Sequence, residues 1–215
     1  MLKAILWDND GVLVDTERLY FQACKEVLAS EGVTLNRAQF TDISLGRGQS
    51  VFGLLGGLTG EEIEPLRQRR NRRYTELLRQ GGLELKGAEA VLKQLFGRLS
   101  MGVVTGSRRD HFEIIHASVD LLRFFDFVLT REDYPKSKPH PDAYLTAMNQ
   151  RGLVAEECVV VEDSERGCKA ATDAGIRCLV VPNDWSAEGD FSCAYKVLPG
   201  IEAVVPEVTR LMEEA

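Results

Sequence analysis

The sequence predicts an α/β fold: a doubly wound, Rossmann-like parallel sheet with an inserted helical domain. Short apolar runs rich in β-branched residues alternate with helical patterns along most of the 215 residues. Continuous apolar runs are typical of strands buried on both faces, and strand–helix alternation favours a parallel sheet. One long helical stretch, residues 16–82, interrupts the alternation and indicates an insertion.

The elements of the alternating part follow from these runs. Predicted strands cover residues 3–7, 100–105, 125–129, 157–162 and 177–181. Predicted helices cover residues 87–97, 108–118, 140–151 and 165–174, the last ending at Gly175. Each helix lies between two strands, as a parallel sheet requires.

The inserted stretch has helical patterns of its own, over residues 19–31, 37–45, 50–55 and 61–79. About 65 residues of helix exceed an ordinary crossover between two strands. We therefore predict two units, an α/β core of residues 1–15 and 83–215 and a helical cap of residues 16–82. The linkers fall near residues 14–17 and 81–87.

Composition narrows the classes of function. Lys and Arg number 26 against 33 Asp and Glu, and a net charge of −7 argues against general nucleic-acid binding. No apolar run approaches the roughly 18 residues of a membrane span, and no signal peptide is evident. Five scattered cysteines without a CxxC pair indicate reduced thiols. We expect a cytoplasmic protein with a small-molecule substrate, monomeric or weakly homo-oligomeric, without nucleic-acid or membrane partners.

An arginine-rich segment, residues 67–73, stands out against the acidic average. It follows Glu61, Glu62 and Glu64, so the predicted helix carries acids early and bases late, the order that suits the helix dipole. A solvated helix face is the preferred interpretation, and a docking patch is the alternative.

Asp8 and Asp10 follow the first predicted strand, and Gly11 comes after them. Residues i and i+2 on a strand point to the same side, so both carboxylates can face one site. Paired carboxylates repel unless a cation or a shared proton lies between them, and Mg²⁺ prefers such oxygen ligands. The alternative is an acidic turn without a site, since Asp and Gly are turn residues.

Other strand ends carry further polar groups. In open parallel sheets, ligands bind beyond the carboxyl ends of the strands. The second strand is followed by Thr105, Gly106 and Ser107, and the fourth ends in Glu162 and Asp163; Lys138 precedes the helix of residues 140–151. Taken singly, these could be helix caps and a surface lysine. Together they predict one site at the edge of the sheet.

These motifs resemble those of the haloacid dehalogenase-like (HAD) phosphohydrolases. The first motif is Asp8-Asn9-Asp10-Gly11-Val12-Leu13-Val14-Asp15-Thr16-Glu17, and Thr105, Lys138 and Glu162-Asp163 match the second, third and fourth. Close matches are also seen in Ser137-Lys138-Pro139-His140-Pro141-Asp142 and Glu162-Asp163-Ser164-Glu165-Arg166-Gly167. The resemblance spans about residues 3–185. The cap resembles that of the β-phosphoglucomutase and phosphoglycolate phosphatase branch.

The resemblance implies a Mg²⁺-dependent phosphatase acting on a small phosphorylated metabolite, such as a sugar phosphate. Asp8 is the implied nucleophile, and Asp10 the implied general acid and base. Thr105, the Gly106 amide and Lys138 are expected to hold the phosphoryl oxygens. The expected metal ligands are Asp8, the backbone carbonyl of Asp10, Asp163 and, through water or by orienting Asp163, Glu162.

Substrate choice is expected to lie with the cap, which would close over the site. The glycine-flanked loop of residues 45–50 resembles the specificity loop of the family, and Arg47 could bind a second anion or hydroxyls. Ser107 and Arg108 could also contact substrate. A solvated loop arginine is the alternative for Arg47. For Tyr20 and His111, packing or surface positions are preferred over the cleft.

Three other functions use similar residues. A phosphomutase of the β-phosphoglucomutase type would need a longer-lived aspartyl phosphate. A phospho-accepting signalling module would use an aspartate, Mg²⁺, a hydroxyl and a lysine, but it needs neither a lid nor a general acid. Haloacid dehalogenation would use the same nucleophile without Mg²⁺, which leaves Asp10 and Asp163 without a purpose.

Overall fold

The computed structural model of the protein describes residues 1–214, in which six strands form one sheet. The strands are β1 (Ala4–Trp7), β2 (Ser100–Val104), β3 (Phe127–Leu129), β4 (Cys158–Glu162), β5 (Arg177–Val180) and β6 (Lys196–Val197). Their order is β3-β2-β1-β4-β5-β6, and all the pairings described are parallel. The predicted α/β fold with a doubly wound parallel sheet is confirmed.

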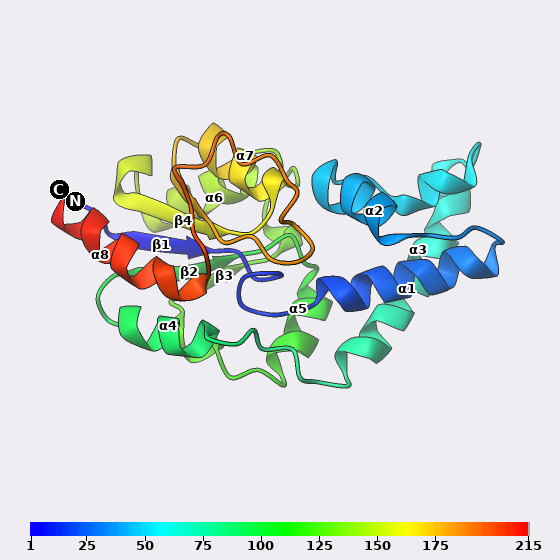
Figure 1. The fold of residues 1–215 in the computed structure, drawn as a ribbon, viewed down its shortest axis with the longest axis horizontal. Coiled ribbons are helices and arrows are strands. Elements are labelled where there is room, and N and C mark those ends of the chain that lie inside the picture. The colour runs from blue at the N-terminus through cyan, green and yellow to red at the C-terminus, as the bar shows by residue number, and fades with distance from the viewer. Residues whose placement is uncertain (215) are drawn as a thin grey trace.

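Helices cover both faces of the sheet (Figure 1). One face carries α4 (Ala88–Leu95), α5 (Arg109–His116) and α8 (Val204–Glu213); the other carries α6 (Asp142–Arg151) and α7 (Glu165–Asp173). Side chains of a strand alternate between the two faces. Ile5 and Trp7 therefore belong to the core under α4 and α8, whereas Ala4 and Leu6 belong to the core under α6 and α7.

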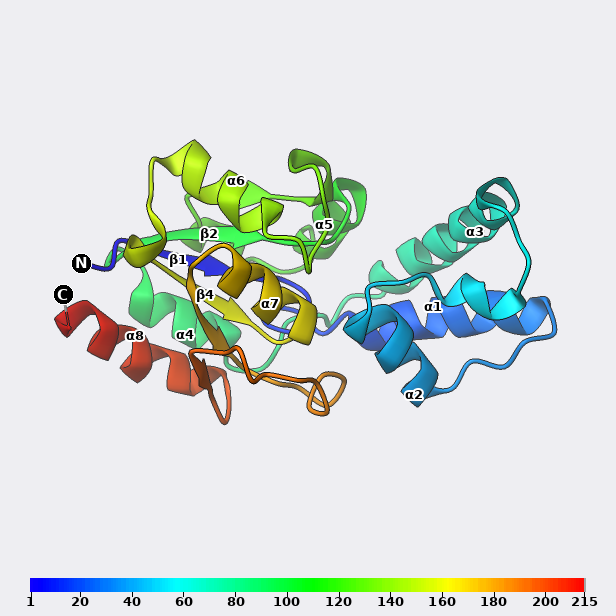
Figure 2. The same cartoon turned by 90° about the horizontal axis from the view of Figure 1, so that it is seen from above.

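The stretch predicted as the cap is helical and lies beyond one end of the sheet (Figure 2). It contains α1 (Glu17–Ser30), α2 (Arg37–Phe40), α3 (Gly60–Leu78), a π-helical turn (Thr41–Gly46) and a 3₁₀ helix (Val51–Leu55). A separate apolar cluster, including Leu28, Phe40 and Phe52, holds these helices together. The division into a core of residues 1–15 and 83–215 and a cap of residues 16–82 stays a proposal.

The chain passes between the sheet and the cap helices twice, and the two passages pair with each other. The backbone N–H of Asp15 donates to the carbonyl of Leu83 at 2.7 Å, and that of Leu85 donates to the carbonyl of Leu13 at 3.0 Å. The N-terminal end of the chain and the end of α8 lie together at the opposite end of the sheet (Figures 1 and 2).

Some elements differ from the sequence-based expectations. Strand β6 and helix α8 were not predicted, and the single helix expected over residues 37–45 is α2 followed by the π-helical turn. Short 3₁₀ turns lie at Leu122–Phe124, Arg131–Asp133, Ala155–Glu157 and Ile201–Ala203. Within residues 1–214, none of the helices has both the length and the apolar character that a membrane crossing requires.

Candidate active site

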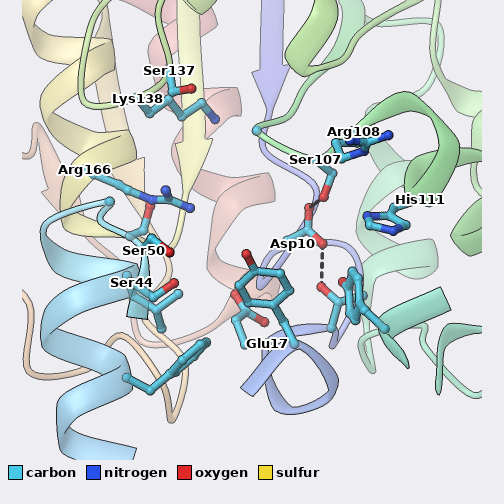
Figure 3. Close-up of a pocket in the computed structure, with 18 of the residues that line it drawn as sticks. Asp10, Glu17, Ser44, Ser50, Ser107, Arg108, His111, Ser137, Lys138 and Arg166 are labelled. Atoms are coloured by element: carbon cyan, nitrogen blue, oxygen red, sulfur yellow. Dashed lines mark hydrogen bonds between the residues drawn. The ribbon is translucent and has the colours of Figure 1, made fainter. Parts of the chain in front are cut away.

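A cavity of about 370 Å³ lies between the carboxyl ends of the strands and the cap helices. The core contributes Asp8, Asp10, Lys138 and Asp163 to its lining, and the cap contributes residues of α1, α3 and the turn before Val51. Figure 3 shows side chains of the core, such as Asp10 and Lys138, and of the cap, such as Glu17 and Ser44, converging from both sides. The structure thus brings the groups at the strand ends together, in the position where α/β sheets bind ligands.

Lys138 forms the buried floor of the site. Its ammonium group donates to Asp8 Oδ1 at 2.8 Å, to Glu162 Oε1 at 2.7 Å and to the Val104 carbonyl at 2.9 Å. The residue is 6% exposed, so both ion pairs are shielded from water. Each of the three ammonium protons of Lys138 thus has an acceptor, and these three hydrogen bonds fix the position of the side chain.

Glu162 is fully buried and its carboxylate is saturated with donors. Tyr144 donates to the oxygen that also binds Lys138, at 2.8 Å, and the hydroxyl of Ser164 donates to the other oxygen at 3.1 Å. Burial alone would raise its pKa, but Lys138 outweighs this and the pKa of Glu162 is lowered. This carboxylate orients Lys138 and the loop after β4 rather than facing the cavity, which it does not line.

Asp8, Glu162 and Asp163 form an acidic cluster, with one carboxylate oxygen of each within 4.8 Å of the others. Burial, followed by the charge of Glu162, raises the pKa of Asp8 to about 7. Burial and then Glu17 raise the pKa of Asp163 well above its ordinary value. Buried carboxylates in such proximity with one lysine between them fit a divalent cation with oxygen ligands.

The side chain of Asp10 is held apart from that cluster by three hydroxyl groups. Thr16 donates to Oδ1 at 2.5 Å, while Ser107 and Thr105 donate to Oδ2 at 2.7 and 3.1 Å. Figure 3 shows Asp10 directed toward Ser107. The two aspartates predicted to face one site thus do different things: Asp8 meets the lysine, and Asp10 meets hydroxyls. The metal role predicted for Asp10 concerned its backbone carbonyl and stays a prediction.

The segment after β2 supplies two of these hydroxyls, those of Thr105 and Ser107, and the unobstructed backbone of Gly106. Thr105 is fully buried, and its hydroxyl also accepts a hydrogen bond from the Ser107 amide at 3.0 Å. Gly106 and Ser107 line the cavity, and no atom lies within 4 Å of a methyl group placed on Gly106. The expected position of this segment at the site is found, with Thr105 turned to Asp10.

The two arginines predicted as substrate contacts differ in placement. Arg47 pairs with Asp42 at 2.6 Å, is more than half exposed and does not line the cavity, although Gly48 and Ser50 of the same loop do. The side chain therefore does not occupy the position expected for a substrate contact. Arg108 lines the cavity and pairs with Asp110 at 2.9 Å.

The arginine-rich helix α3 corrects a sequence-based interpretation. Arg67, Arg70, Asn71 and Tyr74 all line the cavity, at helical spacings of three and four residues. Arg69 and Arg73 point the other way and pair with Glu31 and Glu26, as a solvated face would. The preferred interpretation, a solvated helix face, therefore holds for Arg69 and Arg73 but not for Arg67 and Arg70, which face the site. The spacing could have revealed it. Tyr20 and His111, for which other positions were preferred, line the cavity too.

Three further residues were missed. Glu17 lines the cavity, and burial followed by Asp10 raises its pKa to about 8. Arg166 lines it from α7, forms no ion pair within residues 1–214 and leaves its Nε without a hydrogen-bond partner. Asn183, beyond β5, binds Asp163. Asn183 follows a strand's carboxyl end, the same rule that located the other site groups.

Fold, strand-end acids and buried lysine together define a hydrolase of the haloacid dehalogenase-like type. The sequence profile described as haloacid dehalogenase-like hydrolase matches residues 5–181. The chain belongs to this family, which confirms the resemblance inferred from its motifs.

Individual relatives of the chain include named phosphatases. Hexitol phosphatase B of Escherichia coli K12 is 32% identical over 83% of each chain, and protein CbbY of Rhodobacter capsulatus is 27% identical over 96% of each. The crystal structure of CbbY from Rhodobacter sphaeroides in complex with phosphate superposes with a TM-score of 0.79 at 25% identity, covering 94% of this chain and 95% of that one. The predicted enzyme class, a phosphoric monoester hydrolase of the HAD-like type, is confirmed.

Proposed function

We propose that the protein is a Mg²⁺-dependent phosphatase that hydrolyses a small sugar phosphate through an aspartyl phosphate on Asp8. The observation that carries this proposal is the division of labour between the two aspartates. Asp8 Oδ1 accepts from the buried Lys138, and among residues 1–214 no donor reaches Asp8 Oδ2. Asp10 accepts hydrogen bonds from the hydroxyls of Thr16 and Ser107 at the cavity wall. These different surroundings support attack by Asp8 and proton transfer by Asp10.

In the first step, the free oxygen of Asp8 attacks phosphorus and the bond to the leaving oxygen breaks in line. Lys138 favours the ionised form of Asp8 that attack requires, because it lies 2.8 Å from the other oxygen. Asp10 gives its proton to the departing alkoxide, so the product leaves as an alcohol. In the second step Asp10 takes a proton from water, whose oxygen attacks phosphorus and releases Asp8 and inorganic phosphate.

The chain's own donors surround the transferring group. The amide of Gly106 is proposed to bind a phosphoryl oxygen as charge moves among these oxygens. The protons of Lys138 and Thr105 have protein acceptors in this structure, so the contacts proposed for these two residues with the phosphoryl group would require each of them to exchange an acceptor. Asp8, Asp163 and the backbone carbonyl of Asp10 are the proposed ligands of Mg²⁺. Glu162 is proposed to orient two of them, because it accepts hydrogen bonds from Lys138, which binds Asp8, and from the backbone N–H of Asp163. When bound, the cation screens the repulsion between the Asp8 carboxylate and the phosphate.

The lining of the cavity supports a polar leaving group such as a sugar. It includes Ser44, Gln49 and Asn71, which can bind hydroxyls, and the arginines Arg70 and Arg166, which form no ion pairs within residues 1–214. Hexitol phosphatase B, one of the relatives, bears the name of a sugar-alcohol phosphatase. We further propose a cytoplasmic location, since all five cysteines are free thiols.

A screen of phosphorylated metabolites, with Mg²⁺ and with a chelator, tests the function. The readout is inorganic phosphate, with Asp8→Asn as the blank and isomerised hexose phosphate measured in parallel. Phosphate release that depends on Mg²⁺ and Asp8 supports the proposal. Isomerisation without release would replace it with the phosphomutase alternative, and a stable phosphorylated protein without turnover would indicate a signalling module.

A further inference from the structure

We propose that Asn183 is a positioning residue that clamps two acidic loops together and thereby sets the affinity of the site for its divalent cation. The inference rests on the proposed function, in which Asp8 and Asp163 hold the cation. It concerns a residue outside the motifs, in the irregular segment beyond β5.

The amide of Asn183 joins two loops that come from neighbouring strands. Its Nδ2 donates to Asp163 Oδ2 at 2.9 Å and to the Gly11 carbonyl at 3.2 Å. Asp163 follows β4, and Gly11 follows β1 by way of Asp8 and Asp10. Because both protons of one amide group are used, the two loops are held at a fixed separation.

Asp163 depends on this donor. Within residues 1–214 no other hydrogen bond reaches its carboxylate, and the groups that act on it by charge include three carboxylates, Glu17, Glu162 and Asp8. Gly11 has a φ of +81°, and a methyl group placed there would overlap Asp163 Oδ2. The carboxylate is thus pressed against the first loop, and Asn183 opposes the repulsion that would turn it away from Asp8.

The amide oxygen of Asn183 shapes the loop beyond β5 in which the residue lies. Oδ1 of Asn183 accepts from the backbone N–H of Trp185 at 2.7 Å and of Ser186 at 3.3 Å, which forms an Asx turn. The turn presents the Trp185 ring to the cap, where its centroid lies 5.4 Å from that of Phe21 and 5.8 Å from that of Phe40. One side chain therefore fixes both the acidic cluster and a cap contact.

The two roles can be separated by substitution. Asn183→Ala removes the donors to Asp163 and Gly11 together with the turn acceptor. Asn183→Ser keeps a hydroxyl that can accept from Trp185 but is too short to bridge the two loops. Trp185→Ala leaves the amide in place and removes only the cap contact, so it is the matched control.

The test measures binding of Mn²⁺, in place of Mg²⁺, by the electron paramagnetic resonance signal of the free ion, together with Tm. Both Asn183 variants are expected to weaken Mn²⁺ binding by about 10- to 100-fold, the usual scale for a side chain that orients a metal ligand. Trp185→Ala is expected to lower Tm while the Kd for Mn²⁺ stays within about two-fold of the original, because the ligand-orienting contacts remain.

Folded Asn183 variants that bind Mn²⁺ as tightly as the original protein would overturn the inference while leaving the phosphatase function standing. Should Asn183→Ala fail to fold, Asn183→Ser decides by the same comparison. A wild-type chain that hydrolyses phosphate esters without binding Mn²⁺ would overturn both the inference and the metal dependence of the proposed function. A chain that binds Mn²⁺ and hydrolyses no phosphate ester would overturn the proposed function alone.

Discussion

The hydroxyl of Thr16 donates to Oδ1 of Asp10 at 2.5 Å, although Thr16 occupies the N-cap position of α1. A threonine at that position normally accepts a hydrogen bond from the first turn of its helix. Here no such bond is made, and the hydroxyl donates to the carboxylate of Asp10 instead. The start of the first cap helix is thereby tied to the group proposed to transfer the proton.

Removing the proposed proton donor should affect substrates according to their leaving groups. For Asp10→Asn we expect a loss of about 10²- to 10⁴-fold in kcat with a sugar phosphate, the range of general acid–base catalysis. With p-nitrophenyl phosphate, whose leaving group needs little protonation, the loss should be clearly smaller. Steady-state kinetics on both substrates check this. Equal losses on the two would contradict the acid role of Asp10.

Removing the proposed nucleophile should stop turnover on every substrate. For Asp8→Asn we expect kcat to fall at least about 10³-fold, the scale of losing a catalytic group. Asp15→Asn is the control, because Asp15 pairs with Arg18 outside the cavity. Phosphate release by the two variants is compared at saturating Mg²⁺. Near-normal hydrolysis by Asp8→Asn would end the assignment.

Gly167 makes room for the buried carboxylate that orients Lys138. A methyl group placed on Gly167 would overlap the carboxylate of Glu162. We expect Gly167→Ala to lower the free energy of unfolding by about 1–3 kcal/mol, as overpacking of a buried site does. Gly53→Ala is the control, since nothing lies within 4 Å of the added methyl group. Urea unfolding of both variants provides the measurement, and equal stabilities would refute the steric argument.

The acidic site should make the metal-free protein less stable as the pH rises from 6.5 to 8. The pKa of Asp8 is raised to about 7 and that of Glu17 to about 8, from 3.8 and 4.5. In this window the folded state holds protons that the unfolded state has lost, so stability falls with pH. The slope is up to about 1.4 kcal/mol per pH unit for each such carboxyl.

Urea unfolding in a chelator, at pH 6.5 and pH 8, tests this slope. The effect of His116, whose pKa is lowered to about 4, has the opposite sign but is confined below about pH 6.5. The hydrogen bond with Cys178 lowers the pKa of Cys168 to about 7, which would make stability rise between about pH 7 and 9, so the measurement is made on Cys168→Ala. Glu17→Gln should flatten the slope, because one of the titrating carboxyls is gone. Stability that is constant or rises between the two pH values would contradict the prediction.

Arg166 should act on substrate binding more than on the chemical step. It lines the cavity, forms no ion pair within residues 1–214 and lies beside Gly48 of the cap loop. We expect Arg166→Met to raise KM for a sugar phosphate by roughly 10-fold or more, the scale of a hydrogen bond to a charged group. Arg69→Met, on the opposite face of the cap, is the control. Unchanged KM in Arg166→Met would exclude this contact.

Much of the fold could be predicted because its signals are local. The strands with continuous apolar runs, such as residues 157–162, and the helices between them were predicted close to their observed positions. Strand β6 was missed because it has two residues and is exposed, so no apolar run marks it. Helix α8 was missed although Val204–Glu213 carries the amphipathic pattern of a helix, with Val204, Val208 and Leu211 buried on one side.

The site was predictable where a rule links sequence to position. Asp8, Lys138 and Asp163 lie at strand ends or in motifs, and the structure places them together. Arg70 lies on helix α3, and Asn183 lies in the loop beyond β5. Tertiary packing sets how each of these segments is oriented toward the core, so sequence alone did not place the two residues at the site. Arg47 shows the converse: its loop reaches the cavity, but an ion pair with Asp42 turns the side chain away.

The two ends of the described chain lie side by side at the end of the sheet remote from the cavity (Figure 2). A fusion partner or a surface anchor attached at either end would leave the mouth of the cavity free. Immobilised protein is therefore suited to measuring metal and substrate analogues as they enter, and the cap helices remain unobstructed during the measurement.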